Sequence, residues 1–314
     1  MVTRRLPDAV ESRLRRHYSV TFNDKDEPLG KPEFTKRARG CTGIIATVTD
    51  QISRSLIDAL PESIEIIANF GVGTDHIDLE AARIRGIAVT NTPGVLTEAT
   101  ADIAMLLLLT AARRASAACK VIKSGEWKGW APTSMIGHDI QGKRLAILGM
   151  GRIGSAVARR ARAFGLQIHY HNRRRLSPAQ EVGAIFHSAR DSLLAVADFL
   201  SIHTNASNET RGMIDARAIS LMPRGAILIN TARGDLIDDE AVLSALDSRH
   251  LAAIGLDVFN NEPDVHPGYL SQDDAVILPH IGSATPGTRN AIGNLAVANL
   301  DAFFNGEKLP GRVI

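Results

Sequence analysis

The sequence contains few cysteines and almost no excess of charge of either sign. Its only cysteines, Cys41 and Cys119, are far apart in the chain and stand in neither a metal-binding nor a redox spacing. We therefore expect both to be buried thiols in a reducing compartment. The 36 basic and 34 acidic side chains give a formal net charge of +2, which is too balanced to indicate a nucleic-acid-binding surface.

Long apolar runs are also missing. The longest run, residues 103–109, is far shorter than the roughly 20 residues that a membrane-spanning helix needs, and Arg113 and Arg114 follow it closely. The N-terminal residues contain no apolar stretch long enough for a signal peptide. These absences predict a cytoplasmic protein whose partners include neither a membrane nor a nucleic acid.

Short apolar strands alternate with helical patterns through almost the whole chain, which predicts parallel sheets built from βαβ units. The chain has 314 residues, more than the ~250–300 at which single cores stop growing, so we expect two domains. The stretch 97–123 is apolar on nearly all sides and predicts one long buried helix. Strands are expected at residues 43–47, 64–68, 87–90, 145–148, 167–170, 199–202, 226–229, 253–256 and 276–278, and a final helix at 286–304.

A glycine-rich loop separates a strand at residues 143–148 from a helix at residues 155–164. In such a loop Gly149 permits the tight turn, Gly151 lets the backbone approach a pyrophosphate, and Gly154 lets helix and strand pack closely. The N-terminus of the helix then directs free N–H groups toward the phosphates. A purely structural turn is the simpler alternative, but the strand–loop–helix context indicates a dinucleotide site.

The end of the next strand bears on which dinucleotide binds. A site for NAD usually places an acidic residue there, to accept hydrogen bonds from the ribose 2′-hydroxyl. Here the strand runs into Asn172, Arg173, Arg174 and Arg175, and no acid is available. Guanidinium groups suit a 2′-phosphate, so this run favours NADP over NAD, although a solvated charged loop would have the same composition.

Three polar side chains, Arg233, Glu262 and His280, each follow one of the last three strand candidates. Open parallel sheets bind ligands at the carboxyl ends of their strands, so we expect the three to converge. Arg233 suits a substrate carboxylate, and His280 suits proton transfer near neutral pH. Glu262 would orient the imidazole and favour its charged form. The simpler interpretations are a surface ion pair for Arg233 and a structural role for His280. No metal-ligand spacing is present, so we expect no metal.

These residues and several further motifs resemble the D-isomer specific 2-hydroxyacid dehydrogenase family, and its glyoxylate/hydroxypyruvate reductase branch in particular. The resemblance covers nearly the whole chain, and the combination of motifs is highly specific. The motifs are NFGVGTD at residues 69–75, NTPGVL at 91–96, the glycine loop, NTARGD at 230–235, DVFNNEP at 257–263 and PHIGSAT at 279–285.

The resemblance implies a fold and an assembly. It implies two doubly wound parallel-sheet α/β domains, with a Rossmann cofactor domain inserted into a flavodoxin-like substrate domain. Residues 1–95 plus 286–314 would form the substrate-binding domain, and residues 96–285 the NAD(P)-binding domain. It also implies a homodimer.

The resemblance further assigns roles to individual positions. Arg233, Glu262 and His280 match the family's catalytic set. The backbone N–H groups of Val72 and Gly73 would bind the substrate carboxylate, although this turn alone would be unremarkable. Trp130 matches a tryptophan that reaches the neighbouring subunit's substrate pocket, or it is a loop anchor. Cofactor contacts are implied at Arg152, Ile153, Thr204, Thr231, Asp257, Gly282 and Thr100, of which Thr100 has helix packing as an alternative role.

The function that these features predict is NADPH-favouring reduction of small 2-oxo acids, glyoxylate or hydroxypyruvate, to 2-hydroxy acids. Two alternatives remain open. Some relatives of this fold are dinucleotide-sensing corepressors that keep the trio and act through protein contacts. Others oxidise phosphite or formate. A turnover assay separates a sensor from a reductase, because a sensor binds the cofactor without reducing 2-oxo acids.

Overall fold

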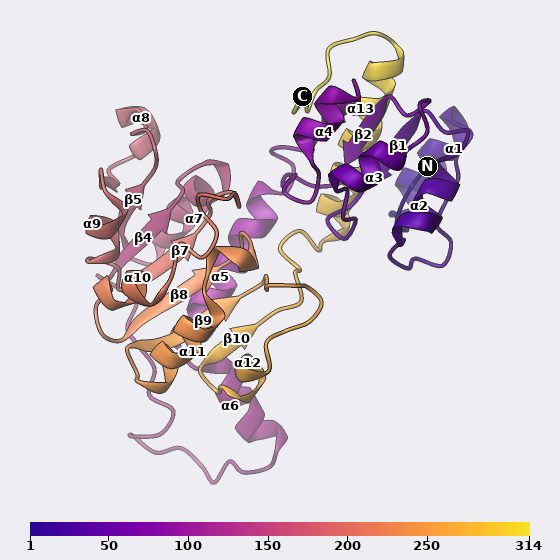
Figure 1. The fold of residues 1–314 in the computed structure, drawn as a ribbon. Coiled ribbons are helices and arrows are strands. Elements are labelled where there is room, and N and C mark those ends of the chain that lie inside the picture. The colour runs from indigo at the N-terminus through magenta and orange to yellow at the C-terminus, as the bar shows by residue number, and fades with distance from the viewer. The chain divides into compact units, whose positions relative to one another are not determined.

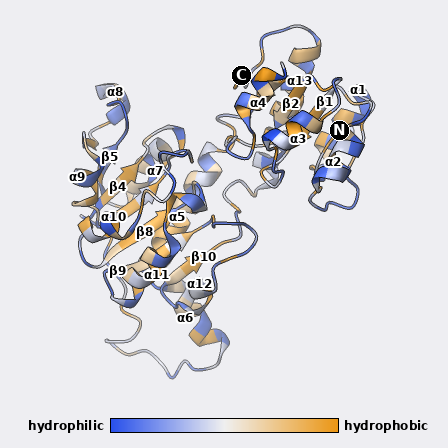
Figure 2. Ribbon diagram, in the orientation of Figure 1, coloured by the Kyte–Doolittle hydropathy of each residue, from blue (hydrophilic) through white to orange (hydrophobic).

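Two parallel sheets organise the chain. The computed structural model describes residues 1–314, which divide into one unit of Met1–Leu96 with Ser283–Ile314 and a second unit of Thr97–Gly282. Figure 1 shows the helices and strands of both units. Most of the strands are apolar, and many of the surrounding loops are polar (Figure 2). No helix combines the length and the apolar sequence that a bilayer crossing requires.

The unit that contains both termini has a sheet whose parallel strands lie in the order β1 (Gly43–Ala46), β2 (Ile66–Asn69) and β3 (Ala88–Thr90). A parallel bridge between Val2 and Ile45 extends this sheet beyond β1. The amide of Val2 in turn donates to the carbonyl of Thr21 at 3.0 Å. The order across the sheet, read from residue 21, therefore corresponds to the 2-1-3-4-5 order of flavodoxin-like sheets.

Helices cover both faces of this sheet, because neighbouring strand residues point to opposite sides. Ile45, Ile66 and Ala68 pack on one side, where α1 and α13 lie. Ile44 and Ile67 pack on the other side, against α2, α3 and α4. The helices of this unit are α1 (Asp8–His17), α2 (Lys31–Ala38), α3 (Arg54–Ala59), α4 (Leu79–Ile84) and α13 (Pro286–Phe304).

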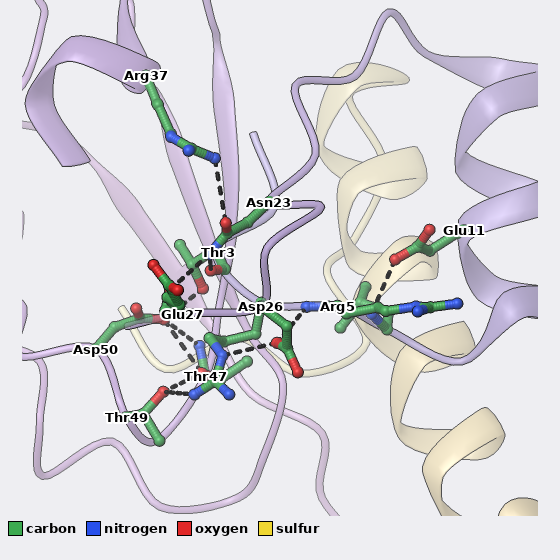
Figure 3. Close-up of polar contacts among 12 residues, drawn as sticks. Thr3, Arg5, Glu11, Asn23, Asp26, Glu27, Arg37, Thr47, Thr49 and Asp50 are labelled. Carbon is green, nitrogen blue, oxygen red and sulfur yellow. Dashed lines mark hydrogen bonds and ion pairs between the residues drawn. The ribbon is translucent and has the colours of Figure 1, made fainter. Parts of the chain in front are cut away.

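Buried polar side chains fix the loops beside β1 (Figure 3). Asn23 is 2% exposed, and its amide donates to the carbonyls of Thr3 and Glu27, both at 2.7 Å. Its own side-chain oxygen accepts from Arg37 at 3.3 Å. The hydroxyl of Thr3 donates to Asp50, whose carboxylate also accepts from the Thr47 amide. Asn23 thus satisfies backbone carbonyls that the sheet leaves unpaired.

The second unit has one parallel sheet of seven strands in the order β10-β9-β8-β7-β4-β5-β6. From β4 the chain first proceeds to β5 and β6, then crosses to β7 and continues the other way, so the topological switch point lies between β4 and β7. The strands are β4 (Arg144–Leu148), β5 (Gln167–His171), β6 (Ile185–Phe186), β7 (Phe199–Ile202), β8 (Ala226–Asn230), β9 (Leu251–Leu256) and β10 (Ala275–Ile277).

Two helical layers enclose this sheet. Helices α5 and α7 pack on Leu145, Ile147 and Ile229, while α9, α10 and α11 pack on Leu148, Leu228 and residues beside them. The helices are α5 (Thr97–Ala112), α6 (Ala115–Lys123), α7 (Arg152–Ala163), α8 (Pro178–Glu181), α9 (Arg190–Leu194), α10 (Ala216–Leu221), α11 (Asp239–Asp247) and α12 (Pro267–Ser271), with a 3₁₀ turn at Gly234–Leu236. This arrangement is the doubly wound fold that the sequence predicted.

The prediction of one helix over residues 97–123 is wrong, because the helix breaks between α5 and α6. Arg114 adopts a left-handed φ of 51° at the break. The carbonyl of Ala112 accepts a hydrogen bond at 2.7 Å from the amide of His138, in the loop that returns from α6. The chain therefore turns at Arg114, and the end of α5 is tied to the loop that follows α6.

The cysteine prediction also needs correction. Cys41 is only partly buried, and Cys119 is exposed on α6. Ala117 is the one buried residue of α6, so this helix lies on the surface of its unit and is not an extension of the buried α5. Cys119 was predicted to be buried because residues 97–123 were taken as one buried helix, whereas only α5 is buried.

Candidate active site

The glycine loop follows β4, and each of its glycines meets a different steric requirement. Gly149 has a φ of 94°, and a Cβ on it would lie 2.8 Å from the backbone of His203. A Cβ on Gly154 would lie 2.5 Å from the carbonyl oxygen of Gly149. Gly151 has no atom within 4 Å of its Cβ position, so open space lies beside it. Two glycines therefore permit close backbone packing, and the third leaves room for a ligand.

The helix after this loop presents its N-terminus without a competing side chain. Helix α7 has Gly151 as its N-cap and makes no side-chain cap hydrogen bond, so the N–H groups of Arg152 and Ile153 in its first turn are not taken up by a cap. Such groups, with the positive end of the helix dipole, suit a phosphate. The open space at Gly151 and this uncapped terminus fit the pyrophosphate of a dinucleotide.

The end of β5 is tied to the glycine loop through Asn172. The Asn172 side-chain oxygen accepts from the Met150 amide at 2.6 Å, and its Nδ2 donates to the Met150 carbonyl at 3.3 Å. Asn172 thus places the start of the arginine run beside the loop.

The three arginines after Asn172 differ in their surroundings. Arg175 donates to both oxygens of Glu181, at 2.8 and 3.1 Å, and Tyr170 donates to the same carboxylate at 2.5 Å. Arg173 and Arg174 are exposed and take part in no ion pair within residues 1–314. Of the three guanidinium groups that the sequence offered, Arg175 is therefore engaged with Glu181, whereas Arg173 and Arg174 are exposed.

His203, which the sequence analysis did not single out, lies on the other side of the loop, just after β7. Its ring Nε2 lies 2.8 Å from the hydroxyl of Ser201, and its backbone contacts Gly149. Burial of the ring lowers the pKa of His203 to about 4. The imidazole is therefore neutral near pH 7. Its place directly before Thr204, at the end of the strand next to β4, was the signal available in the sequence.

The catalytic candidates follow three neighbouring strands. Arg233 follows β8, Glu262 follows β9 and His280 follows β10, and these strands are adjacent and parallel. Their carboxyl ends therefore meet at one edge of the sheet. Three residues separated by 29 and 18 positions in the chain are brought to the same edge by topology.

His280 and Glu262 are in direct contact. The ring Nδ1 of His280 lies 2.7 Å from Oε2 of Glu262, and the two side chains are 31% and 32% exposed. The other carboxylate oxygen accepts from the amide of Phe259 at 2.9 Å. Burial alone would raise the pKa of Glu262, but the hydrogen bond and charge of His280, the Phe259 amide and the charge of Arg233 together lower it. Glu262 is thus held as an anion against the ring, which leaves Nε2 of His280 for a reactant.

Asp257 holds the loop that carries His280. Its carboxylate accepts from the amides of Ile281 and Gly282, both at 2.7 Å, and the residue is 1% exposed. Burial raises the pKa of Asp257, although the two amides oppose that shift. His280 itself has a left-handed φ of 53°, a conformation that a non-glycine residue adopts only when its surroundings impose it.

Thr100 lies beside this loop. A Cβ on Gly282 would lie 3.1 Å from the Asp257 carboxylate and 3.6 Å from the Thr100 hydroxyl oxygen. The structure therefore brings together Thr100, Asp257 and Gly282, three of the positions that the family resemblance named as cofactor contacts. The absence of a side chain at Gly282 keeps the three groups close.

Arg233 is fixed through its backbone. Asn230 accepts from the Ala232 amide at 2.9 Å and donates to the Arg233 carbonyl at 2.7 Å. A Cβ on Gly234 would lie 1.9 Å from the carbonyl carbon of Phe259, so the loop that carries Arg233 packs directly on the loop that carries Glu262. The hydroxyl oxygen of Thr231, two residues before Arg233, is buried and has no hydrogen-bond partner in the chain.

The remaining positions from the sequence analysis lie elsewhere. Val72 and Gly73 belong to the other unit, where they follow β2. Trp130 lies in the loop after α6 and is 83% exposed. Thr204, which follows His203 after β7, is partly buried, and its amide nitrogen lies beside Gly149.

Comparison with known proteins agrees with this architecture. Residues 105–282 match the family described as D-isomer specific 2-hydroxyacid dehydrogenase, NAD binding domain. The chain is 40% identical to the glycerate dehydrogenase of Hyphomicrobium methylovorum over 98% of this chain and 96% of that protein. It is also 40% identical to the glyoxylate reductase of Thermococcus onnurineus, over 100% of this chain and 95% of that one.

A solved structure gives the same result. The NADPH-dependent glyoxylate/hydroxypyruvate reductase of Sinorhizobium meliloti, in complex with NADP and malonate, is 35% identical, with a TM-score of 0.90 over 99% of this chain and 95% of that one. These similarities extend over the full length and include the sheet edge described above. The chain belongs to the D-isomer specific 2-hydroxyacid dehydrogenase family, in its glyoxylate reductase branch.

Proposed function

We propose that this protein reduces small 2-oxo acids, glyoxylate or hydroxypyruvate, to the corresponding 2-hydroxy acids with a nicotinamide dinucleotide. The observation that carries the proposal is the His280–Glu262 contact of 2.7 Å at the carboxyl edge of the sheet that also bears the glycine loop. Relatives named glyoxylate reductase and glycerate dehydrogenase, and a relative bound to NADP and malonate, support this substrate class.

The chain's residues supply the proton and the anion clamp. When bound, the reduced nicotinamide supplies the hydride for the carbonyl carbon. His280 donates the Nε2 proton to the carbonyl oxygen as that oxygen takes up negative charge. Glu262 stays bound at Nδ1, where it stabilises the imidazolium before transfer and keeps the ring oriented afterwards. In the oxidative direction the same nitrogen accepts the proton.

Substrate orientation depends on carboxylate binding. Arg233 binds the substrate carboxylate through its guanidinium group and polarises the neighbouring carbonyl. The backbone N–H groups of Val72 and Gly73 donate to the same carboxylate. In this proposal residues 1–95 plus 286–314 form the substrate-binding domain, and residues 96–285 bind the cofactor. A homodimer is part of the proposal, with Trp130 reaching the neighbouring subunit's pocket. Its 83% exposure in a loop leaves the indole available for such a contact.

NADPH is the preferred reductant in this proposal. Arg173 and Arg174 are exposed next to Asn172, and no acidic side chain at this end of β5 is available for a ribose 2′-hydroxyl. A 2′-phosphate would pair with the two guanidinium groups. The glycine loop, Arg152 and Ile153 bind the pyrophosphate. Thr100, Thr204, Thr231, Asp257 and Gly282 line the remainder of the cofactor site.

The test is a panel of 2-oxo acids, each assayed with NADPH and with NADH. Glyoxylate and hydroxypyruvate should be the best substrates, with NADPH giving the higher kcat/KM. Arg233→Ala should keep NADPH affinity and lose about 100-fold or more in kcat/KM for glyoxylate, because a charge-assisted bidentate contact is removed. Cofactor binding without turnover would instead identify a dinucleotide sensor. A wild-type-like kcat/KM for Arg233→Ala would refute the role of Arg233.

A further inference from the structure

The turn at residues 71–73 is held almost entirely by its carbonyl groups. The side-chain amide of Asn69 donates to the carbonyls of Gly71 at 3.1 Å and Gly73 at 2.8 Å. The side-chain amide of Asn91 donates to the carbonyl of Val72 at 2.8 Å. Three consecutive carbonyls are therefore fixed by two asparagines that lie 22 positions apart, one at the end of β2 and one directly after β3.

The N–H groups of this turn, unlike its carbonyls, have no hydrogen-bond partner in the chain. The amides of Gly71, Val72 and Gly73 donate to no backbone or side-chain acceptor of the chain, and the three residues are only partly buried. The amide of Thr92 adds a further hydrogen bond to the Gly71 carbonyl, at 3.0 Å. All the hydrogen bonds that fix the turn thus lie on its carbonyl side.

Peptide planarity links these two observations. In a trans peptide the C=O of one residue and the N–H of the next point in opposite directions within one plane. Holding the Gly71 carbonyl inward therefore directs the Val72 N–H outward, and holding the Val72 carbonyl inward directs the Gly73 N–H outward. Asn69 and Thr92 therefore fix the direction of the Val72 N–H, and Asn91 fixes the direction of the Gly73 N–H.

We infer that Asn69 and Asn91 are positioning residues that aim the N–H groups of Val72 and Gly73 at the substrate carboxylate. The inference deepens the proposed function and rests on it for the identity of the anion. Neither asparagine touches the substrate. Each acts through a peptide plane, and each determines a separate donor.

Both asparagines are themselves anchored. Asn69 is 1% exposed, and its side-chain oxygen lies 3.1 Å from Nε2 of the buried His76. Since Nδ2 of Asn69 is occupied by two carbonyls, this ring nitrogen must be the donor, and it fixes which way the amide faces.

The backbone of Asn91 is held by the C-terminal segment. The Asn91 amide donates to the Gly311 carbonyl at 2.8 Å, and its carbonyl accepts from Asn299 on α13 at 3.2 Å. Asn299 is fully buried and also accepts from the Gly311 amide at 2.8 Å. A Cβ on Gly311 would lie 2.0 Å from the Asn91 carbonyl oxygen, so only glycine permits this approach. The last residues of the chain thus support the Gly73 donor through Asn91.

The test compares Asn91→Ala with Asn23→Ala in the full-length, NADPH-loaded protein. Asn23 is the control, because it lies in the same unit and its amide also donates to backbone carbonyls, those of Thr3 and Glu27 (Figure 3). Asn23 is buried and Asn91 only partly buried, so the control removes at least as much packing. We expect Asn91→Ala to raise KM for glyoxylate about 10-fold, since a donor to a charged group is misdirected, while the Kd for NADPH stays unchanged. Asn23→Ala should lower Tm at least as much and leave KM unchanged.

Two further variants follow the same reasoning. Asn69→Ala should raise KM less than Asn91→Ala, because the Thr92 amide still holds the Gly71 carbonyl, whereas the Val72 carbonyl loses its donor in Asn91→Ala. Gly311→Ala should reproduce the KM increase of Asn91→Ala without altering any residue of the turn. If Asn91→Ala and Asn23→Ala change KM by the same factor, the side chain has a structural role only and the inference is overturned.

Oxalate binding separates this inference from the proposed function. Oxalate is a dicarboxylate that cannot be reduced, and its Kd can be measured by calorimetry on the NADPH-loaded wild type. If the wild type reduces no 2-oxo acid but Asn91→Ala weakens oxalate binding about 10-fold relative to Asn23→Ala, the inference stands and the reductase proposal fails. If turnover is normal and oxalate affinity is equal in the two variants, the proposal stands and the inference fails.

Discussion

The carboxyl edges of the two sheets carry their polar groups in different ways. In the unit Thr97–Gly282, the edge presents ionisable side chains, and the backbone beneath them is fixed by Asp257, Asn230 and Gly234. In the other unit, the edge after β2 presents main-chain N–H groups, and the side chains of Asn69 and Asn91 face inward to hold carbonyls.

This difference has an experimental consequence. A reactive side chain can be removed by one substitution, so its contribution appears directly in kcat. A main-chain donor cannot be removed in this way and can only be redirected by changing the groups that hold it. Substitutions of His280 and Glu262 at the first edge should therefore act mainly on the chemical step, whereas those at the second edge should act on carboxylate affinity.

The largest effect is expected from His280→Gln, which removes the proton donor. Positioned acid–base groups contribute about 10²–10⁴-fold, so kcat for glyoxylate should fall by that factor while NADPH still binds. His266→Gln is the matched control, because His266 also pairs with a carboxylate, Glu240, at 3.2 Å. If both variants keep wild-type kcat, the distinction between the two edges disappears.

A smaller loss is expected from Glu262→Gln, about 10-fold to 100-fold in kcat, because the hydrogen bond to a charged partner is weakened. Steady-state kcat for glyoxylate at saturating NADPH measures this loss. An unchanged kcat would mean that the carboxylate of Glu262 does not assist His280.

The lowered pKa of Glu262 also predicts how its contribution to stability depends on pH. The pKa of Glu262 is lowered in the folded protein, so its contribution to stability is present above about pH 4.5 and is lost as pH falls through the lowered value. Glu262→Gln lacks this contribution at every pH. The difference in Tm between wild type and variant should therefore shrink on acidification, and a difference that grows would contradict the assignment.

Substitutions of the exposed arginines after β5 should change the preference between NADPH and NADH. Replacing Arg173 and Arg174 together by Ala should raise KM for NADPH about 10-fold and change KM for NADH little, because only the 2′-phosphate loses its partners. Arg175→Ala is the control, since that guanidinium is bound to Glu181. Equal changes for NADPH and NADH would remove the 2′-phosphate argument.

The smallest effect concerns His203, whose ring is neutral in the folded protein. Because its pKa is lowered to about 4 in the folded state and is about 6.5 when unfolded, the folded protein binds fewer protons between these values. Stability should therefore fall as pH drops from about 6.5 to 4. His203→Asn, which has no proton to gain, should lose less Tm over this range than the wild type. An identical loss in the two proteins would place the acid sensitivity elsewhere.

The sequence predicted those features that depend on neighbouring residues. Parallel sheets of βαβ units followed from apolar runs such as Phe199–Ile202 that alternate with helical patterns, and the doubly wound two-domain fold followed from the family resemblance. The final helix was expected at residues 286–304, and the structure has it at Pro286–Phe304. The convergence of Arg233, Glu262 and His280 followed from the rule that parallel strands bind ligands at their carboxyl ends. The chemistry of the three side chains was evident from their residue types.

Features that depend on distant contacts could not be predicted. The chain turns at Arg114, where the sequence has neither glycine nor proline, and Arg175 is paired with Glu181 at the end of α8. Asn69 and Asn91 were visible as motif residues, but nothing in their local sequence shows that both hold one turn. The two-residue strand β6 (Ile185–Phe186) was missed because it is too short to give a pattern.

The link between Asn172 and Met150 limits how the enzyme could be redesigned. The asparagine lies at the start of the segment that an engineer would exchange to convert the protein from one coenzyme to the other, yet both of its polar atoms bind the glycine loop. Grafting an acidic residue at position 172 would place a carboxylate oxygen against the Met150 carbonyl and shift the loop for either coenzyme. A successful conversion should keep residue 172 and change residues 173 and 174 alone.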